Sequence, residues 1–251
     1  MQSDTERLRG AIDAIHLRFG DQALRHGSRL PGAEPWSTGI GELDRLAGIR
    51  GLPMGRISVL QGPAGSGKLS IGLALLARAT RELAHAIVVD HRVGFDPWAL
   101  EPFQPQLARL AVVRPPDPAT AGEAAVALAR SGAGFLLLLG EIPESALVPL
   151  ESSAARSSAV VVAVAGARDA ALAHASSLTL AVERSAWLRE RGEIVGLRSR
   201  VTCVKNKLAP PGAATELEIR YPLGSRVFPE RPLAIVQYEE HPRWVVRTAV
   251  G

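Results

Sequence analysis

The residues with the clearest chemical potential lie in the glycine-rich segment LQGPAGSGKLSIG. Gly62 is followed after four residues by Gly67 and Lys68, which fits the spacing G-x-x-x-x-G-K. Backbone N–H groups of such a loop converge on phosphate at a helix N-terminus, and the lysine reaches the terminal phosphates of a nucleotide. The next residue normally supplies a hydroxyl for Mg²⁺, but here it is Leu69, and Ser70 comes one residue too late. The segment therefore predicts a phosphate-binding loop without its metal-binding hydroxyl.

The segments on both sides of this loop have the patterns of a strand and a helix. RISVLQ (56–61) is a short apolar run, and LSIGLALLARATREL (69–83) follows the loop with helical spacing. GFLLLLG (134–140) is apolar on both faces, which indicates a strand buried in a parallel sheet. Strands that alternate with helices before a β-rich end predict an α/β fold with a mostly parallel central sheet. The other expected elements are a helix over 119–132 and strands over 85–90, 107–115, 158–166, 178–185, 200–207, 215–221, 233–240 and 243–250.

Residues 4–24 have the pattern of one amphipathic helix. Its apolar residues recur at helical spacing, at Leu8, Ile12, Ile15 and Phe19. A stretch dense in glycine and proline follows, which indicates a linker. We therefore expect four parts, namely a separate N-terminal helix for subunit or partner contact (1–27), a linker (28–36), an α/β core (37–224) and a β-rich C-terminal extension (225–251).

Composition narrows the class of protein. The chain has 251 residues, of which 47% are apolar, and this is enough for a sizeable core. A formal net charge of +4 is a modest excess that permits contact with nucleic acid or an acidic protein surface. Cys203 is the only cysteine, which excludes an intramolecular disulfide, and the histidines lack metal-binding spacing, so no metal site is expected. Since no apolar run reaches membrane-spanning length and the start lacks a signal-peptide pattern, we expect a cytoplasmic protein that does not bind membranes.

Three stretches, in the same order, resemble the RecA recombinase family. STGIGELDRLAGIRGLPMGRISVLQGPAGSGK (37–68) resembles the family around its phosphate-binding loop, VVDHRVGFDPWA (88–99) the segment after its second core strand, and RVTCVKNKLAPP (200–211) its late hairpin. The resemblance covers residues 37–224 and implies a RecA-like P-loop core. It also implies nucleotide contacts at Gly62, Gly65, Gly67, Lys68, Leu69, Ser70, Asp96 and Trp98.

The resemblance further implies an interface. The N-terminal helix of RecA packs onto the neighbouring subunit, and lysines that match Lys205 and Lys207 reach across to the neighbour's ATP. We therefore expect these two lysines and the apolar stripe of the helix to contact a subunit or a partner. A solvated hairpin tip is the alternative interpretation of the lysines.

Four positions depart from the family's catalytic pattern. The carboxylate that orients the attacking water should lie two residues after Asp90, where this sequence has Arg92. The strand that should end in a Mg²⁺-binding Asp ends in Gly140, with Glu141 out of register. Leu69 lacks a hydroxyl, and the strand VVVAVAGA lacks the polar pair that senses the γ-phosphate. We therefore expect no catalytic residues, no bound metal and no required cofactor; weak Mg-free binding of ATP or ADP and no binding at all stay open.

The loops that hold single-stranded DNA in RecA are expected to be short here. Only EIPESALVPLESSAARS and ARDAALAHASS follow the two strands concerned, and RecA's small C-terminal domain has no counterpart after the core. A protein that binds single strands usually has aromatic residues interleaved with its basic ones. The basic segment late in the core lacks this interleaving: Arg184, Arg189, Arg191, Arg198 and Arg200. Weak or no direct DNA binding is expected.

A short RecA-like chain with these losses is similar to the ImuA-type accessory proteins of translesion mutagenesis. This implies a cytoplasmic, nucleoid-associated protein of the SOS response to DNA damage, with RecA and an ImuB-type polymerase-like subunit as partners and self-association through the N-terminal helix. The alternative is a DNA-dependent ATPase of the recombinase or mediator class, with Lys68 at the phosphates and Glu141 positioning the water. A circadian or signalling RecA-fold ATPase lacks support, because the matches are with bacterial RecA.

Overall fold

The computed structural model describes residues 10, 13–14, 17–18, 34–166, 169–221 and 247–248. Contacts divide the chain into two units, Met1–Ala33 and Glu34–Gly251, which are described separately. In the first unit the described residues are helical and exposed. The apolar stripe that we expect on this helix lies outside the described residues (Leu8, Ile12, Ile15 and Phe19).

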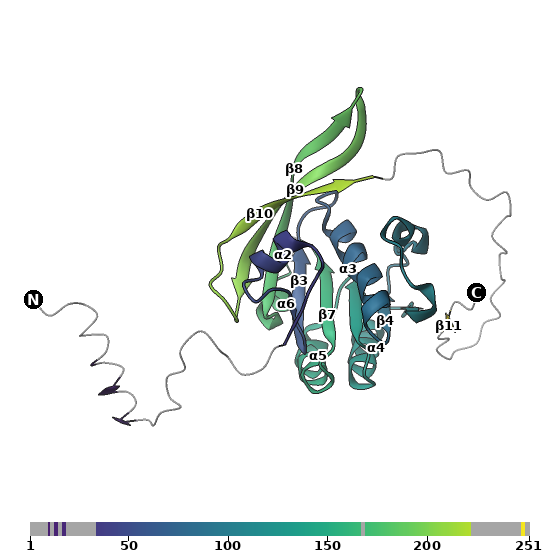
Figure 1. Cartoon of the computed structure of the whole chain (residues 1–251). Helices are drawn as coiled ribbons and strands as arrows, with labels where there is room; N and C mark the ends of the chain where they lie inside the picture. The colour runs from purple at the N-terminus through teal and green to yellow at the C-terminus, as the bar shows by residue number, and fades with distance from the viewer. Residues whose placement is uncertain are drawn as a thin grey trace, which may run out of the picture. The chain divides into compact units, whose positions relative to one another are not determined.

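Among its described residues, the second unit is built on one nine-stranded sheet (Figure 1). Its strands are β3 (Arg56–Gln61), β4 (Ala86–Asp90), β5 (Leu110–Val113), β6 (Phe135–Leu139), β7 (Val160–Ala165), β8 (Leu178–Glu190), β9 (Glu193–Asn206), β10 (Ala214–Arg220) and β11 (Arg247–Thr248). Their order across the sheet is β10-β9-β8-β3-β7-β6-β4-β5-β11. The six strands from β8 to β5 are parallel, whereas β9, β10 and β11 are antiparallel to their neighbours. The predicted α/β fold with a mostly parallel sheet is confirmed.

Helices cover both faces of the parallel strands (Figure 1). Successive strand residues point to opposite faces, so Leu137 packs with α3 (Lys68–Glu82) in one core cluster and Leu138 with α4 (Pro118–Arg130) and α5 (Glu144–Ser157) in the other. These two leucines are fully buried. The shorter elements are β1 (Pro35–Trp36), α2 (Gly41–Leu46), β2 (Leu52–Pro53), α6 (Ala170–Ala175) and two 3₁₀ segments, η1 (Pro97–Phe103) and η2 (Leu107–Arg109).

Some element boundaries differ from the sequence-based expectation. The strand expected over 107–115 begins at Leu110, because η2 occupies the preceding three residues. β8 extends beyond the expected 178–185 to Glu190, and β9 begins at Glu193. The residues added to β8 (186–190) are mostly exposed, whereas Val195, Leu197 and Ser199 of β9 are buried. Cross-strand pairing between β8 and β9 joins both sets of residues in a projecting hairpin.

The end of the chain is described in part. The strand expected over 233–240 lies outside the described residues. Of the run expected over 243–250, Arg247 and Thr248 pair antiparallel with Val112 and Ala111 of β5. In the described part of the chain, no helix is both long enough and apolar enough to span a membrane.

Candidate phosphate-binding site

The loop between β3 and α3 has the conformation that its glycines permit. Gly65 and Gly67 have φ angles of 71° and 93°, in the left-handed region that disfavours residues with a Cβ. α3 begins at Lys68, directly after this turn. The loop therefore leads into a helix N-terminus, which is the geometry that suits a phosphate group.

Two glycines of the loop are also required by packing against β8, β9 and β10. A Cβ on Gly62 would collide with the carbonyl oxygen of Val182 in β8. A Cβ on Gly67 would lie 2.6 Å from Oγ of Ser199 and 2.7 Å from Cδ1 of Ile219. The late hairpin and β10 therefore press directly on the phosphate-binding loop.

Side chains of the β8–β9 hairpin bond to the loop. Ser199 is fully buried, and its hydroxyl donates to the carbonyl oxygen of Ser66 at 2.6 Å. The Arg184 guanidinium donates to the carbonyl oxygen of Gly65 at 3.3 Å, and its Cζ lies 4.2 Å from the ring centroid of Trp187. These contacts fix the loop between α3 and the hairpin.

The lysine of the motif is folded onto its own loop. Nζ of Lys68 donates to the carbonyl oxygens of Gly62 and Pro63 at 2.7 and 2.9 Å. Burial lowers the pKa of Lys68 below its ordinary value. The ammonium group of Lys68 thus lies against the backbone of the loop, and a ligand that bonds to this backbone could also contact the ammonium group.

At the end of β4, the carboxylate of Asp90 accepts hydrogen bonds from the backbone of the following loop. Asp90 is fully buried, and its two oxygens accept from the backbone N–H groups of Arg92 at 3.2 Å and Phe95 at 2.7 Å. The carboxylate therefore holds the loop after β4 in place. The Arg92 guanidinium lies 3.4 Å from the Glu141 carboxylate, and both side chains are mostly exposed.

At the end of β6, a histidine fills the space beside Gly140. This glycine has a φ of 105°, and a Cβ on it would lie 2.7 Å from Nδ1 of His91, with Cε1 nearer still. Nδ1 of His91 is buried and has no hydrogen-bond partner. An aspartate at position 140, where the family pattern places one, would therefore require the imidazole of His91 to move.

These elements enclose a cavity of about 460 Å³. Of the predicted site residues, it brings together Gly65, Gly67, Lys68, Leu69, Ser70, Arg92 and Gly140. Asp96, Trp98, Gly62 and Glu141 are not among its lining residues. The carboxylate of Asp96 accepts from the backbone N–H of Trp98 and begins η1, and Trp98 is exposed. The sequence reasoning missed Leu197 and Tyr221, which reach the cavity from the hairpin and the end of β10 and carry no local motif.

The cavity does not fit Mg²⁺, which requires about six oxygen ligands with at least one carboxylate in most protein sites. The two oxygens of Asp90 accept backbone N–H groups, and Leu69 offers no oxygen. Position 140 has no side chain, and Arg92 brings a positive charge to the same cavity. A divalent cation in this cavity would therefore lie near the Arg92 guanidinium and the Leu69 side chain, and it would lack the carboxylate and the hydroxyl that it needs as ligands.

The two lysines of the predicted interface have different surroundings. Nζ of Lys205 donates to the carbonyl oxygens of Ala173 and His174 at 2.7 and 2.6 Å, at the C-terminal end of α6. Burial, followed by the charge of Lys207, lowers the pKa of Lys205. Lys207 itself is exposed. Lys205 thus bonds to the C-terminal end of α6, whereas Lys207 is exposed to solvent.

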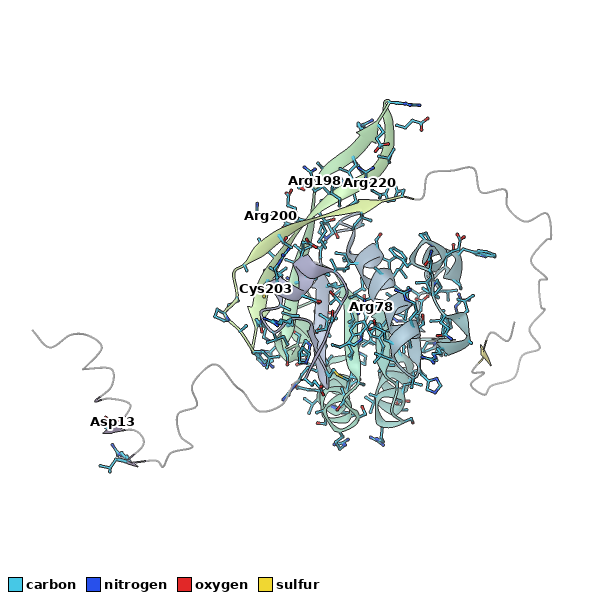
Figure 2. The ribbon with its side chains drawn as sticks, viewed as in Figure 1. Asp13, Arg78, Arg198, Arg200, Cys203 and Arg220 are labelled. Atoms are coloured by element: carbon cyan, nitrogen blue, oxygen red, sulfur yellow. The ribbon has the colours of Figure 1, made fainter. Side chains whose placement is uncertain are left out.

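Much of the positive charge on β9 and β10 is locally compensated. Figure 2 shows Arg198, Arg200 and Arg220 on these strands. Arg198 lies 2.6 Å from Glu218 and 3.7 Å from Glu216, and Arg220 lies 2.6 Å from the carboxylate of Glu190. Arg198 and Arg220 are therefore parts of a mixed-charge ladder, which is a poor template for a phosphate backbone.

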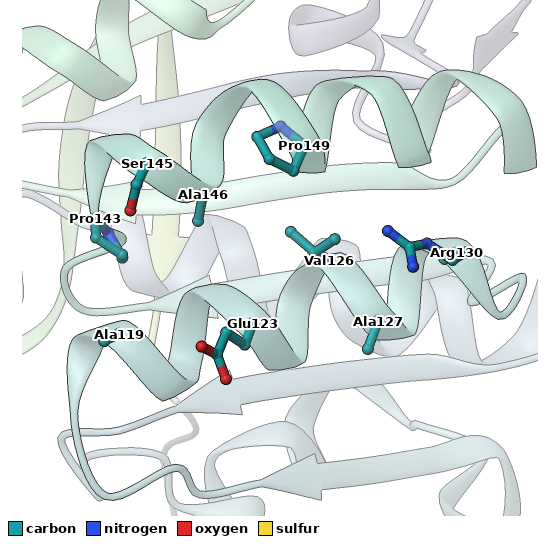
Figure 3. A pocket seen from close by; sticks show the side chains of 9 residues that line it. All are labelled: Ala119, Glu123, Val126, Ala127, Arg130, Pro143, Ser145, Ala146 and Pro149. Carbon is teal, nitrogen blue, oxygen red and sulfur yellow. The ribbon is translucent and has the colours of Figure 1, made fainter.

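A second cavity of about 410 Å³ lies between α4 and α5 (Figure 3). Its charged lining residues, Glu123 and Arg130, both come from α4 and are two helical turns apart. The rest of its lining is mainly apolar. This cavity has no acid–base pair among its lining residues and adds no catalytic site.

Comparison with known proteins places this geometry in context. The RecA N-terminal domain family matches residues 6–157. Protein RecA of Chlorobium limicola is 30% identical over 258 residues, covering 86% of this chain and 74% of that protein. Protein RecA of Symbiobacterium thermophilum is 30% identical over 280 residues, covering 95% of this chain and 79% of that protein. The crystal structure of the RadB recombinase is similar with a TM-score of 0.58 at 17% identity, over 73% of this chain and 95% of that chain, which shows a shared fold.

Proposed function

Because the chain belongs to the RecA family of DNA recombination and repair proteins, we propose that it is an ImuA-type accessory protein without ATP hydrolysis. In this role it acts in the response to DNA damage, at the nucleoid, and supports translesion synthesis and mutagenesis. It acts through protein partners, which are RecA and an ImuB-type polymerase-like subunit.

One observation carries the loss of hydrolysis. Hydrolysis by this fold requires a carboxylate that positions water and a metal that neutralises the phosphates. In this chain, the first place holds Arg92, and the space beside Gly140 is filled by the ring of His91. A site with both groups would therefore need changes at both positions.

The partner role is supported by what the chain keeps. The RecA family match begins at residue 6, so it includes most of the segment 4–24 with its amphipathic pattern. Lys207 is exposed on the segment that resembles the interface hairpin of RecA. A subunit that docks on RecA without a water-positioning group would cap or loosen a filament rather than extend it.

Direct DNA binding is proposed to be weak or absent. After β6 the chain reaches α5 through four residues, and α6 occupies much of the connection from β7 to β8. These are the connections that in RecA hold single-stranded DNA. The mixed-charge ladder on β9 and β10 offers little net positive charge in their place.

ATP turnover by the purified chain, with and without single-stranded DNA, tests the loss of hydrolysis. We expect turnover equal to that of the Lys68→Ala variant under both conditions. DNA-stimulated turnover that disappears in Lys68→Ala would reject the proposal.

Partner binding tests the positive half of the proposal. We expect the chain to bind RecA and to lower its strand-exchange rate, and deletion of residues 1–27 to abolish both effects. If the purified chain neither binds RecA nor alters strand exchange, the accessory mechanism is wrong.

The second candidate is a DNA-dependent ATPase of the recombinase or mediator class, with Glu141 as the water-positioning group. Glu141 is exposed, pairs with Arg92 and does not line the cavity that contains Lys68. This geometry disfavours the second candidate. It predicts turnover that is lost in both Glu141→Gln and Lys68→Ala.

A further inference from the structure

We propose that the cavity beside Lys68 binds a polyphosphate chain as its metal-free anion, with Arg92 and Lys68 supplying the positive charge that Mg²⁺ would otherwise bring. The inference goes beyond the accessory role and does not depend on it. It follows from the misfit between the cavity and a divalent cation.

Two cations from different elements line one cavity. Lys68 comes from the start of α3, and Arg92 follows β4. The partner of Arg92 is Glu141, at 3.4 Å in an exposed pair, and such pairs are weak in water. Arg92 can therefore exchange this carboxylate for a phosphate at little cost, and a guanidinium binds phosphate in a bidentate manner.

The surroundings select against a metal. Both oxygens of Asp90 accept hydrogen bonds from backbone N–H groups, so the buried carboxylate is already engaged by the loop after β4. Leu69 and Gly140 supply no oxygen ligand. A phosphate chain that arrives with Mg²⁺ would bring a hydrated cation toward Arg92, and like charges repel.

The size of the cavity suits more than one phosphate group. Its volume of about 460 Å³ is within the range of small-molecule sites. The left-handed glycines at the loop and the two cations surround the same space. The loop backbone and the two cations would recognise the phosphate chain itself, which is common to inorganic polyphosphate and a nucleoside triphosphate.

Isothermal titration calorimetry of the full chain tests the inference, with inorganic tripolyphosphate and ATP as separate probes. Each probe is titrated in EDTA and again with saturating Mg²⁺, at matched ionic strength. We expect both probes to bind in EDTA, with dissociation constants within about tenfold of each other, and Mg²⁺ to weaken binding at least tenfold, which is about 1.4 kcal/mol.

Variants locate the binding. Arg92→Gln should weaken tripolyphosphate binding about tenfold in EDTA and reduce the effect of Mg²⁺, because one charge-assisted contact is lost. Arg45→Gln is the control, since Arg45 is an exposed arginine of α2 outside this cavity. Tighter binding with Mg²⁺ would overturn the inference. So would failure of tripolyphosphate to bind, or equal binding by wild type and Arg92→Gln. Partner binding by RecA has a separate readout, so either proposal can fail alone.

Discussion

The imidazole of His91 occupies the space that any side chain on Gly140 would need. The two residues directly follow the neighbouring parallel strands β4 and β6, so their contact is set by the sheet. Since the left-handed φ of Gly140 also disfavours other residues, the contact explains why this strand end accepts glycine and no acidic side chain. The loss of the metal-binding carboxylate is thus coupled to the residue after Asp90.

Gly140→Asp is predicted to lower the free energy of unfolding by about 2–4 kcal/mol, because it combines a collision with a strained backbone. Urea denaturation measures this change. His91→Ala should recover the collision part and leave only the backbone cost, so the double variant should be more stable than Gly140→Asp alone. Gly166→Asp is the control, since a Cβ there meets no atom within 4 Å. Equal stability of the single and double variants would contradict the proposed contact.

Ser199→Ala is predicted to destabilise the phosphate-binding loop. The substitution leaves the buried carbonyl oxygen of Ser66 without its donor, which costs about 1–3 kcal/mol. Hydrogen exchange at the backbone amides of Gly62 and residues 64–67 should rise together with the loss in unfolding free energy. Ser185→Ala is the matched control, because the exposed hydroxyl of Ser185 donates to the backbone carbonyl oxygen of Arg198 on the same hairpin. Its loss should change the free energy of unfolding by less than about 0.5 kcal/mol. Unchanged exchange in Ser199→Ala would show that the hairpin does not hold the loop.

Lys205→Met and Lys207→Met are predicted to separate a structural from a docking role. Lys205 donates to two carbonyl oxygens at the end of α6, so its replacement should lower the free energy of unfolding by about 1 kcal/mol. Lys207→Met should leave stability within about 0.5 kcal/mol of wild type and weaken RecA binding. Thermal denaturation and surface plasmon resonance measure the two effects. The opposite assignment, with Lys207→Met the less stable variant, would refute the structural role of Lys205.

The acid stability of the chain is predicted to include a contribution from Asp117. Its side chain caps the N-terminus of α4, and hydrogen bonds from the backbone N–H and the hydroxyl of Thr120 lower its pKa from the ordinary value of 3.8. A depressed carboxyl pKa contributes stability above the unfolded value and loses it as the pH falls through the lower folded value.

Asp117→Asn keeps a cap that does not titrate. The stability advantage of wild type over this variant should therefore shrink as the pH falls from about 5 toward 3, as urea denaturation at each pH measures. Glu123→Gln, on the same helix, controls for loss of a negative charge. A difference between wild type and Asp117→Asn that stays constant with pH would contradict the prediction.

The sequence was sufficient for the elements that carry strong local patterns. The apolar runs of β3, β4, β6 and β7 lie in a parallel sheet as predicted, because buried strands need apolar side chains on both faces. The phosphate-binding loop was recognisable because glycine spacing encodes its backbone conformation. The family followed from the same local segments.

The sequence by itself also determined which chemical groups are missing, since Leu69, Arg92 and Gly140 can be read directly from their positions after strands and loops. Only the tertiary structure decided what replaced them. His91 beside Gly140, Glu141 turned toward Arg92, and Ser199 on the phosphate-binding loop are contacts between residues far apart in sequence or on neighbouring strands. Such contacts depend on strand order and register, which no local pattern specifies, because each strand's periodicity fixes the face of a side chain but not its neighbour.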